Sequence, residues 1–445
     1  MVDRPGTVTF AEPPEGPAGT PALACGQEVR EAAVPASTVF SPYARLFTVP
    51  GARAFSLAGW FARVPMATVG LGSVLLVQAE SGSYALAGAI AGTLSLAFAL
   101  ASPQWARVMD RYGQGPVLRW TALAYLVLGL SFVAVVLAGL PHWTWFALAV
   151  LSGASGTSIG SVVRSRWAHA LEDPAQRQTA FAFESVADEV VFVTAPPLVT
   201  FLAALVSPPA GFLTGLLVGV VGGLVMSRLE STAPPVAPRV AGQPQVRIRV
   251  LTAGLVAVSV TYLAMGVVFG AMDVVVVGFA DAEGRPAVAG LALSAYAAGS
   301  LVAGLVYGVV RLPGTLVTRF LGCALLFAAA AQTLYLVDSL TLLIGLAFLA
   351  GLTIAPVLVA GMSLVESRVP RASLTESLTW TSTGLTVGVT AGSALAGTAV
   401  DRWGAETAFA VPALGAALTG LLGVAAWVVL RRPTGQVAEA VPAAH

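Results

Sequence analysis

Residues 251–279 read LTAGLVAVSVTYLAMGVVFGAMDVVVVGF, and this stretch holds a single charged side chain, Asp273. An α-helix rises about 1.5 Å per residue, so about 20 residues cross the ~30 Å hydrocarbon core of a bilayer. The stretch is longer than that and almost wholly apolar. It therefore predicts a transmembrane helix.

The same pattern recurs along the chain, and charged residues make up only 10% of it. Soluble proteins carry roughly 25% charged residues, so a chain of this composition cannot build a water-soluble surface. We predict an all-α membrane protein with twelve transmembrane helices in two pseudo-symmetric halves of six. The predicted spans are 53–77, 84–106, 117–138, 143–165, 179–206, 210–228, 251–279, 287–310, 314–337, 340–366, 373–400 and 405–430.

All 23 basic residues are arginines, and their distribution predicts the orientation. With a cytoplasmic N-terminus, 20 arginines fall on the cytoplasmic side, Arg285 and Arg402 fall outside, and Arg63 lies within the first helix. Basic residues concentrate on the cytoplasmic side of membrane proteins. We therefore expect both termini in the cytoplasm and the protein in the inner (plasma) membrane. The arginine-only composition is typical of a GC-rich, actinobacterial-like genome.

The span 229–250, LESTAPPVAPRVAGQPQVRIRV, interrupts the apolar pattern. It is polar and rich in proline, which predicts a cytoplasmic linker between the halves. The predicted organisation is a disordered N-terminal tail (1–42), a six-helix bundle (43–228), this linker, a second six-helix bundle (251–432) and a C-terminal tail (433–445). The first residues lack a basic segment followed by an apolar stretch, so we expect no cleaved signal peptide and expect the first apolar segment to direct membrane insertion.

Several function classes find no support in the sequence. The net charge of +1 does not favour nucleic-acid binding. The two cysteines and three histidines are far apart, so we expect neither a metal site nor a cofactor. No Walker phosphate loop is present, and no soluble catalytic domain is evident, so we expect a non-enzyme that draws its energy from an ion gradient. The two cysteines are Cys25 and Cys323, and the three histidines are His142, His169 and His445.

A short motif follows the second predicted helix. Residues 106–113 read ARVMDRYG, which resembles the G-x-x-x-D-R-x-G signature of the major facilitator superfamily. Ala106 replaces the leading glycine, and the basic pair that usually follows is absent. The resemblance implies a twelve-helix secondary transporter that binds a small molecule. It also implies a gating role for Asp110, Arg111 and Gly113, in which Asp110 caps or pairs with a helix of the other half and Arg111 holds the loop.

Two further elements bear on the resemblance. Residues 397–404, GTAVDRWG, are a second copy of the signature on the outer side. Ala195-Pro196-Pro197 is similar to the Gly-Pro element in the fifth helix of drug–proton antiporters. Proton-coupled export of a small, partly apolar molecule is therefore our first hypothesis. The alternatives are uptake of a sugar or organic anion through Arg63, and, in a different class, a non-transporting receptor or a membrane-embedded enzyme.

Charged residues within the spans are candidate functional residues, because a charge at the bilayer centre costs about 2.5–3.5 kcal/mol on insertion scales. Arg63 lies at mid-depth in the first span, and Glu184, Asp188 and Glu189 lie in the fifth. Since these helices are neighbours in the family, we expect an ion pair between Arg63 and Asp188 or Glu189. Three interpretations stay open: a static buried pair, a proton-coupling centre in which a carboxylate alternates between a proton and arginine, and recognition of an anion by Arg63.

The remaining candidates concern a central cavity. Asp273 is expected to line it and, with the acids of the fifth helix, to be a candidate for proton coupling. Trp60, Arg63, Tyr296 and Trp380 are candidates for contact with the substrate. Arg164 is interpreted as a cytoplasmic anchor, although arginine in the fourth helix also belongs to a family signature of proton coupling. We expect a monomer whose partners are a small molecule, protons and the lipid bilayer.

Overall fold

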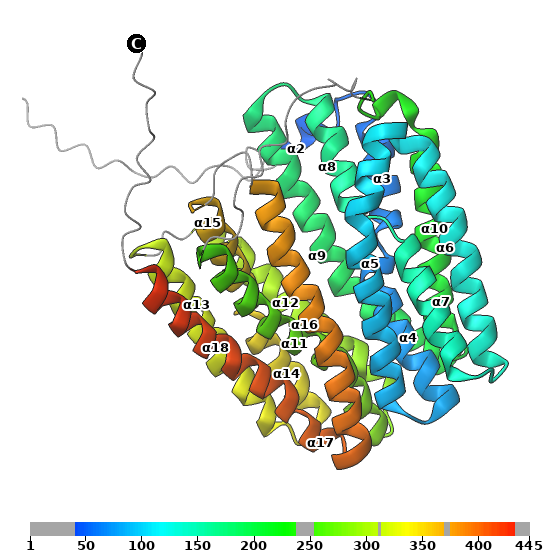
Figure 1. The fold of residues 1–445 in the computed structure, drawn as a ribbon, viewed down its shortest axis with the longest axis vertical. Coiled ribbons are helices and arrows are strands. Elements are labelled where there is room, and N and C mark those ends of the chain that lie inside the picture. The colour runs from blue at the N-terminus through cyan, green and yellow to red at the C-terminus, as the bar shows by residue number, and fades with distance from the viewer. Residues whose placement is uncertain (1–40, 237–252, 310–312, 369–373, 432–445) are drawn as a thin grey trace, which may run out of the picture. The chain divides into compact units, whose positions relative to one another are not determined.

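The computed structural model describes residues 41–236, 253–309, 313–368 and 374–431, and these residues form helices and no β-strand (Figure 1). Twelve helical stretches among them are long and apolar enough to cross a membrane, which confirms the predicted number of spans. Most of the predicted N-terminal tail, linker residues 237–250 and the C-terminal tail lie outside the described residues.

The helices form two sets that follow one another along the chain. The first set comprises α2 (Ser41–Leu46), α3 (Ala52–Ala62), α4 (Pro65–Ser81), α5 (Tyr84–Tyr112), α6 (Gln114–Leu137), α7 (His142–Ser155), α8 (Ile159–Ala170), α9 (Pro174–Leu205) and α10 (Ala210–Arg228). The second comprises α11 (Ala253–Ala282), α12 (Ala289–Val309), α13 (Leu316–Gln332), α14 (Leu340–Gly351), α15 (Ile354–Glu366), α16 (Leu374–Trp403), α17 (Ala405–Ala408) and α18 (Ala410–Leu430). Single 3₁₀ turns occur at η1 (Glu230–Thr232), η2 (Pro286–Val288) and η3 (Thr333–Leu336).

Four spans consist of two helices each, where the sequence predicted one continuous helix; in the last of them, only Phe409 separates α17 from α18. The first span breaks at Arg63 and Val64, because Pro65 has no backbone N–H and its ring does not fit inside a helical turn. The fourth breaks at 156–158, where Gly156 is extended, and the tenth breaks at 352–353. The first break places Arg63 at the end of a helix rather than in its middle.

The tightest contact within the second half joins α11 and α16. Gly384, Gly388 and Gly392 of α16 face carbonyl groups of α11, and a Cβ atom at Gly388 would overlap the carbonyl oxygen of Leu263. Small residues permit such close approach between membrane helices. These glycines therefore bind two helices of the same half together.

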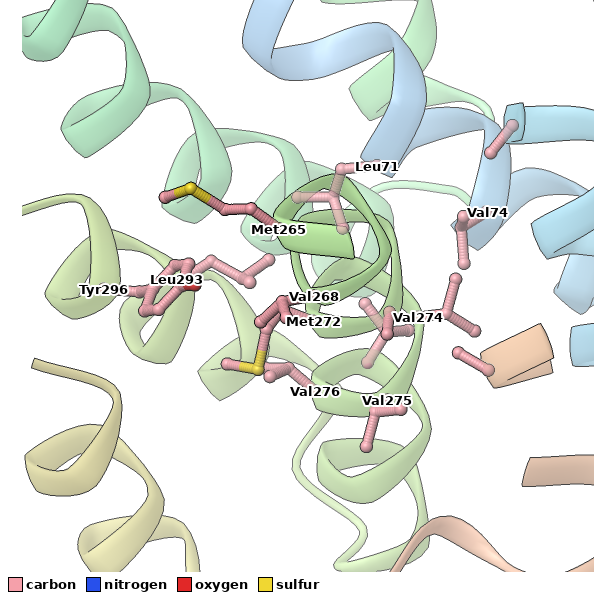
Figure 2. Close-up of a cluster of buried hydrophobic side chains, with 14 of the residues drawn as sticks. Leu71, Val74, Met265, Val268, Met272, Val274, Val275, Val276, Leu293 and Tyr296 are labelled. Carbon is pink, nitrogen blue, oxygen red and sulfur yellow. The ribbon is translucent and has the colours of Figure 1, made fainter. Parts of the chain in front are cut away.

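The two halves meet along a seam that α5, α9 and α4 form with α16, α12 and α11. Helices α5 and α16 lie side by side in Figure 1, and a Cβ atom at Gly88 of α5 would overlap the carbonyl oxygen of Ser393 in α16. Figure 2 shows Leu71 of α4 and Tyr296 of α12 on different sides of α11. Both side chains are buried, so the hydrophobic core is continuous across the seam.

One end of the seam is held by Asp401, at the C-terminal end of α16. Its carboxylate accepts hydrogen bonds from the backbone N–H groups of Tyr84 and Ala85, both at 2.8 Å, and from the Ser83 hydroxyl at 2.7 Å. The Tyr84 hydroxyl donates to Asp281 of α11 at 3.0 Å. We call the end of the bundle that carries these contacts the Asp401 end, and the opposite end, where α10 leads into residues 229–236, the linker end.

A second set of bonds across the seam depends on the prolines of α9. Pro197 has no N–H, so the carbonyl of Val193 lacks its donor within the helix. The Ser294 hydroxyl of α12 donates to that carbonyl instead. Three residues after Pro197, the Thr200 hydroxyl lies 3.0 Å from the carbonyl of Pro196 in its own helix and 3.2 Å from the carbonyl of Ala287 in the other half, and can donate to either. The Ala-Pro-Pro element thus joins α9 to the other half.

Candidate functional site

A cavity of about 710 Å³ lies between the two halves. Its wall contains residues from each of the helices α3 to α10 in the first half, and from α11, α12, α15 and α16 in the second. Most of the lining is apolar, and ligand pockets of roughly 300–1,000 Å³ hold drug-sized molecules. The charged residues of the wall are Arg63, Arg164, Asp188, Glu189 and Asp273.

The seam borders this cavity towards the Asp401 end. Val389 of α16 and Pro196 of α9 line the cavity. The next residue of α16, Thr390, donates its hydroxyl hydrogen to the carbonyl of Gly92 in α5 at 3.0 Å. Contacts between the halves therefore begin where the cavity wall ends.

Arg63 lies in a buried network of ion pairs on the first-half side of the cavity. Its Nη2 atom is 2.6 Å from Oε2 of Glu184, and its Nη1 atom is 3.3 Å from Oδ1 of Asp188. Arg63 is 3% exposed and Glu184 only 1%. The predicted pair with Asp188 is present, Glu184 lies closer still, and Glu189 is not part of the network.

Helix α8 supplies two further members of the network, Arg164 and Trp167, and α3 supplies Ser56. Nη2 of Arg164 lies 3.0 Å from Oδ2 of Asp188. Oε1 of Glu184 accepts hydrogen bonds from Nε1 of Trp167 at 2.7 Å and from the Ser56 hydroxyl at 3.4 Å. The sequence predicted Arg164 to be an anchor at the cytoplasmic surface, and Trp167 was not among the predicted residues. Their spacing of three residues, which puts both on one face of a helix, was the signal available.

The network holds α3, α8 and α9 together. The guanidinium groups of Arg63 and Arg164 are compensated by the carboxylates of Glu184 and Asp188. Loss of one partner would leave an uncompensated buried charge, which costs about 3–5 kcal/mol. Nε of Arg63 is buried and has no hydrogen-bond partner among the described residues. Each of the two guanidinium groups on this wall is nevertheless paired with a carboxylate through its Nη atoms.

Glu189 and Asp273 differ from the other charged residues of the wall. Both are half-buried, both line the cavity, and neither makes a hydrogen bond or ion pair with a residue that the structure describes. Glu189 belongs to α9 in the first half and Asp273 to α11 in the second. The cavity thus carries one uncompensated carboxyl group on each half.

Aromatic rings lie close to these two carboxyl groups. Phe192 follows Glu189 by three residues on α9, and Phe269 precedes Asp273 by one turn of α11. Phe269 and Tyr296 pack edge to face, with ring centroids 6.3 Å apart. Nearly all of the Tyr296 side chain is buried, and its hydroxyl has no hydrogen-bond partner among the described residues.

Two of the predicted substrate-contacting residues do not line the cavity. A continuous helix would put Trp60 and Arg63 on one face, but α3 ends at Ala62, so the two residues are not in register. Trp60 packs against Phe61 instead. Trp380 of α16 is 53% exposed and lies outside the wall. Arg63, Tyr296 and Asp273 do line the cavity, as the sequence predicted.

The signature residues are part of helix α5 rather than of a loop. Asp110 and Arg111 lie in its last turn and are exposed, and the helix ends at Tyr112, directly before Gly113, which has a φ of 88°. Arg111 lies over the ring of Tyr112, and Asp110 makes no hydrogen bond or ion pair with a described residue. The contact with the other half that the resemblance implied for Asp110 is formed in this conformation by Asp401, at the opposite end.

Comparison with known proteins identifies the family. A sequence profile of the Major Facilitator Superfamily matches residues 55–281 and 254–443. The chain belongs to this superfamily. No curated protein matches it in sequence. As a member, it is a membrane transporter and not an enzyme.

Solved structures share the fold. A crystal structure of the nucleoside transporter NupG has a TM-score of 0.66 and 13% identity, over 86% of this chain and 100% of that chain. A bacterial homologue of the iron transporter ferroportin, in an inward-facing state, has a TM-score of 0.63 and 17% identity, over 86% and 99%. The POT family transporter PepTSo has a TM-score of 0.62 and 13% identity, over 87% and 98%.

Proposed function

We propose that the protein exports a small molecule in exchange for protons, by alternating access to the cavity. The moving parts are the halves 43–228 and 251–432, and the binding site is the cavity that they share. The hydrogen bonds of Asp401, Thr200 and Ser294 across the seam support this proposal, because such bonds can form and break without disturbing either half.

The observation that carries the proposal is the pair of uncompensated carboxyl groups, Glu189 and Asp273, on the cavity wall. A carboxyl group binds either a proton or a positively charged group, and each excludes the other. Because the two compete for one site, the carboxyl group carries a proton in one direction across the membrane and the positively charged solute in the other. The result is exchange of the two. An inward gradient of proton concentration then drives the solute outward, and each net positive charge that moves inward per cycle adds about 2.3 kcal/mol for each 100 mV of membrane potential.

The network around Arg63 supports a structural role in this scheme. Glu184 and Asp188 already neutralise Arg63, so recognition of an organic anion by this arginine would require the network to open. We therefore do not propose anion uptake. A carboxylate of the network could also exchange its arginine for a proton, but Glu189 and Asp273 reach the cavity without breaking an ion pair.

The distribution of arginine supports an orientation for this transporter. We infer that the linker end and both termini face the cytoplasm and that the Asp401 end faces outward, in the plasma membrane. The contacts between the halves beyond the cavity, at the Asp401 end, then lie on the outer side of the membrane. We also propose that the transporting unit is a monomer.

Transport by the purified full-length protein in proteoliposomes tests the proposal. A pH-sensitive dye trapped inside reports the loss of an imposed proton gradient when a solute from a chemically diverse panel is added. We expect solute-dependent proton flux from the wild type, its loss in Glu189→Gln and Asp273→Asn, and no change in Glu283→Gln. Glu283 is an exposed acid outside the cavity and provides the matched control. Flux that persists in the double cavity variant, or folded protein that moves no solute, contradicts the proposal.

A further inference from the structure

The charges of the cavity wall restrict the class of molecule that it can bind, if the cavity is the transport site proposed above. Arg63 and Arg164 are the only cationic side chains on the described wall, and both are paired with carboxylates at 2.6–3.3 Å. Glu189 and Asp273 remain without a positive partner. When these two carboxyl groups are ionised, the wall therefore carries an excess of negative charge.

The two acids are placed so that a ligand in the cavity can contact both of them. They lie in opposite halves, on α9 and α11, and line the same cavity. A solute between them touches both halves at once. A positively charged solute supplies the compensating charge that the protein does not, and charges held away from water need such a partner.

The surroundings of the acids favour an organic cation over a metal ion. Among the described residues no group of three or more His, Cys, Asp or Glu side chains could hold a metal. The wall near the acids instead offers the faces and edges of Phe192, Phe269 and Tyr296, together with Met272. Aromatic rings attract organic cations and bury their apolar parts, whereas a hydrated metal ion gains little from them.

We propose that the cavity binds an organic cation with an apolar body, such as a lipophilic amine or quaternary ammonium compound, and that Glu189 and Asp273 are the acidic groups that recognise its charge. The Tyr296 hydroxyl, buried and without a partner among the described residues, is available to a hydrogen-bond acceptor on the same molecule. The cavity volume of about 710 Å³ accommodates a drug-sized solute. This proposal rests on the proposed function and adds the class of substrate.

Two probes of equal size and opposite charge test the proposal directly. Tetraphenylphosphonium and tetraphenylborate share a shape and an apolar surface and differ in the sign of their charge. Calorimetric titration of the purified full-length protein in detergent should show saturable binding of tetraphenylphosphonium and none of tetraphenylborate. Equal binding of both probes, or binding of tetraphenylborate alone, overturns the proposal. This comparison uses the wild-type protein only, so it does not depend on whether a variant folds.

Variants then assign the binding to the acids. Glu189→Gln and Asp273→Asn keep the shape of each side chain and remove its charge, and each should weaken tetraphenylphosphonium binding by about tenfold or more. Glu283→Gln is the matched control and should bind like the wild type. Glu189→Asp, which keeps the charge, should retain part of the affinity. Wild-type affinity in the Glu189→Gln/Asp273→Asn double variant, with an unchanged unfolding temperature, overturns the proposal.

Failure of this proposal and failure of the proposed function give different results. If proteoliposomes exchange protons for a neutral or anionic solute while tetraphenylphosphonium does not bind, the transporter proposal stands and the organic-cation proposal is wrong. If tetraphenylphosphonium binds through Glu189 and Asp273 but no solute moves, the cation site stands and the exchange proposal is wrong.

Discussion

Replacement of Asp401 should shift the protein towards a conformation that is open at the Asp401 end. In the described conformation its carboxylate accepts three hydrogen bonds, from the Ser83 hydroxyl and from two backbone N–H groups at the start of α5. Those N–H groups belong to the first turn of a helix, which a negative charge stabilises. Asp401→Ala removes all three bonds across the seam.

The size of the effect follows from the exposure of the site. A hydrogen bond to a charged group contributes about 1.5–3 kcal/mol when water is excluded, but Asp401 is exposed, so water replaces much of each lost bond. Loss of a helix N-cap, the closest measured analogue, costs about 0.5–2 kcal/mol. We expect about 1–2 kcal/mol, a change of about 5–30-fold in the ratio of the two conformations.

Distances between spin labels across the Asp401 end measure that ratio. Leu140 and Glu283 are exposed, lie at this end, and belong to different halves. With Cys25 and Cys323 replaced, labels at these two positions should show a larger fraction of long distances in Asp401→Ala than in the wild type.

Two further variants complete the experiment. Asp401→Asn should lie between the wild type and Asp401→Ala, because its amide oxygen still accepts from the start of α5. Asp338→Ala removes an exposed acid at the same end that makes no hydrogen bond with a described residue, and should change nothing. Superimposable distance distributions for Asp401→Ala and the wild type would refute our assignment of Asp401 as the residue that holds this end together.

Three other substitutions test the buried network and the seam. Glu184→Gln should lower the free energy of unfolding by about 3 kcal/mol. The control Arg119→Ala breaks the exposed 3.9 Å pair with Glu230 and should change this free energy by less than about 1 kcal/mol. Equal effects of the two substitutions in thermal unfolding would contradict the importance of burial. Ser294→Ala leaves the Val193 carbonyl without a donor and should favour the open Asp401 end by about 1–3 kcal/mol in the same label experiment. Gly88→Val should open the seam further, because its side chain would overlap α16, and unchanged distances would show that the helices are not in close contact there.

The number of helices could be predicted from the sequence, and their breaks could not. Twelve apolar stretches identify twelve spans, because length and apolarity decide whether a segment crosses a membrane. Hydropathy does not register a break of two or three residues such as those at Arg63–Val64, at 156–158 and at 352–353. The misplacement of Trp60 follows from this, since the break after Ala62 separates two residues that a continuous helix would align.

The candidate site was partly predictable for a similar reason. Arg63 and Asp188 lie at matching depths, which was enough to predict their pair. Depth could not distinguish among Glu184, Asp188 and Glu189, because their faces on α9 depend on which neighbours pack against that helix. Arg164 lies near the end of a span, where arginine usually contacts lipid headgroups. Only the packing of α8 on α9 shows that it turns inward to Asp188.

The seam near Gly88 is built largely from main chain, and this affects how fast it can separate. At this point a glycine on α5 faces the carbonyl oxygen of Ser393 directly, with no side chain between them. Interlocked side chains would have to change rotamer each time the helices part and meet again, with a loss of conformational entropy at every cycle. Helix backbones keep their own hydrogen bonds throughout. Such a surface can separate and re-form many times with little reorganisation, which suits a protein that must pass through the same motion for every molecule it carries.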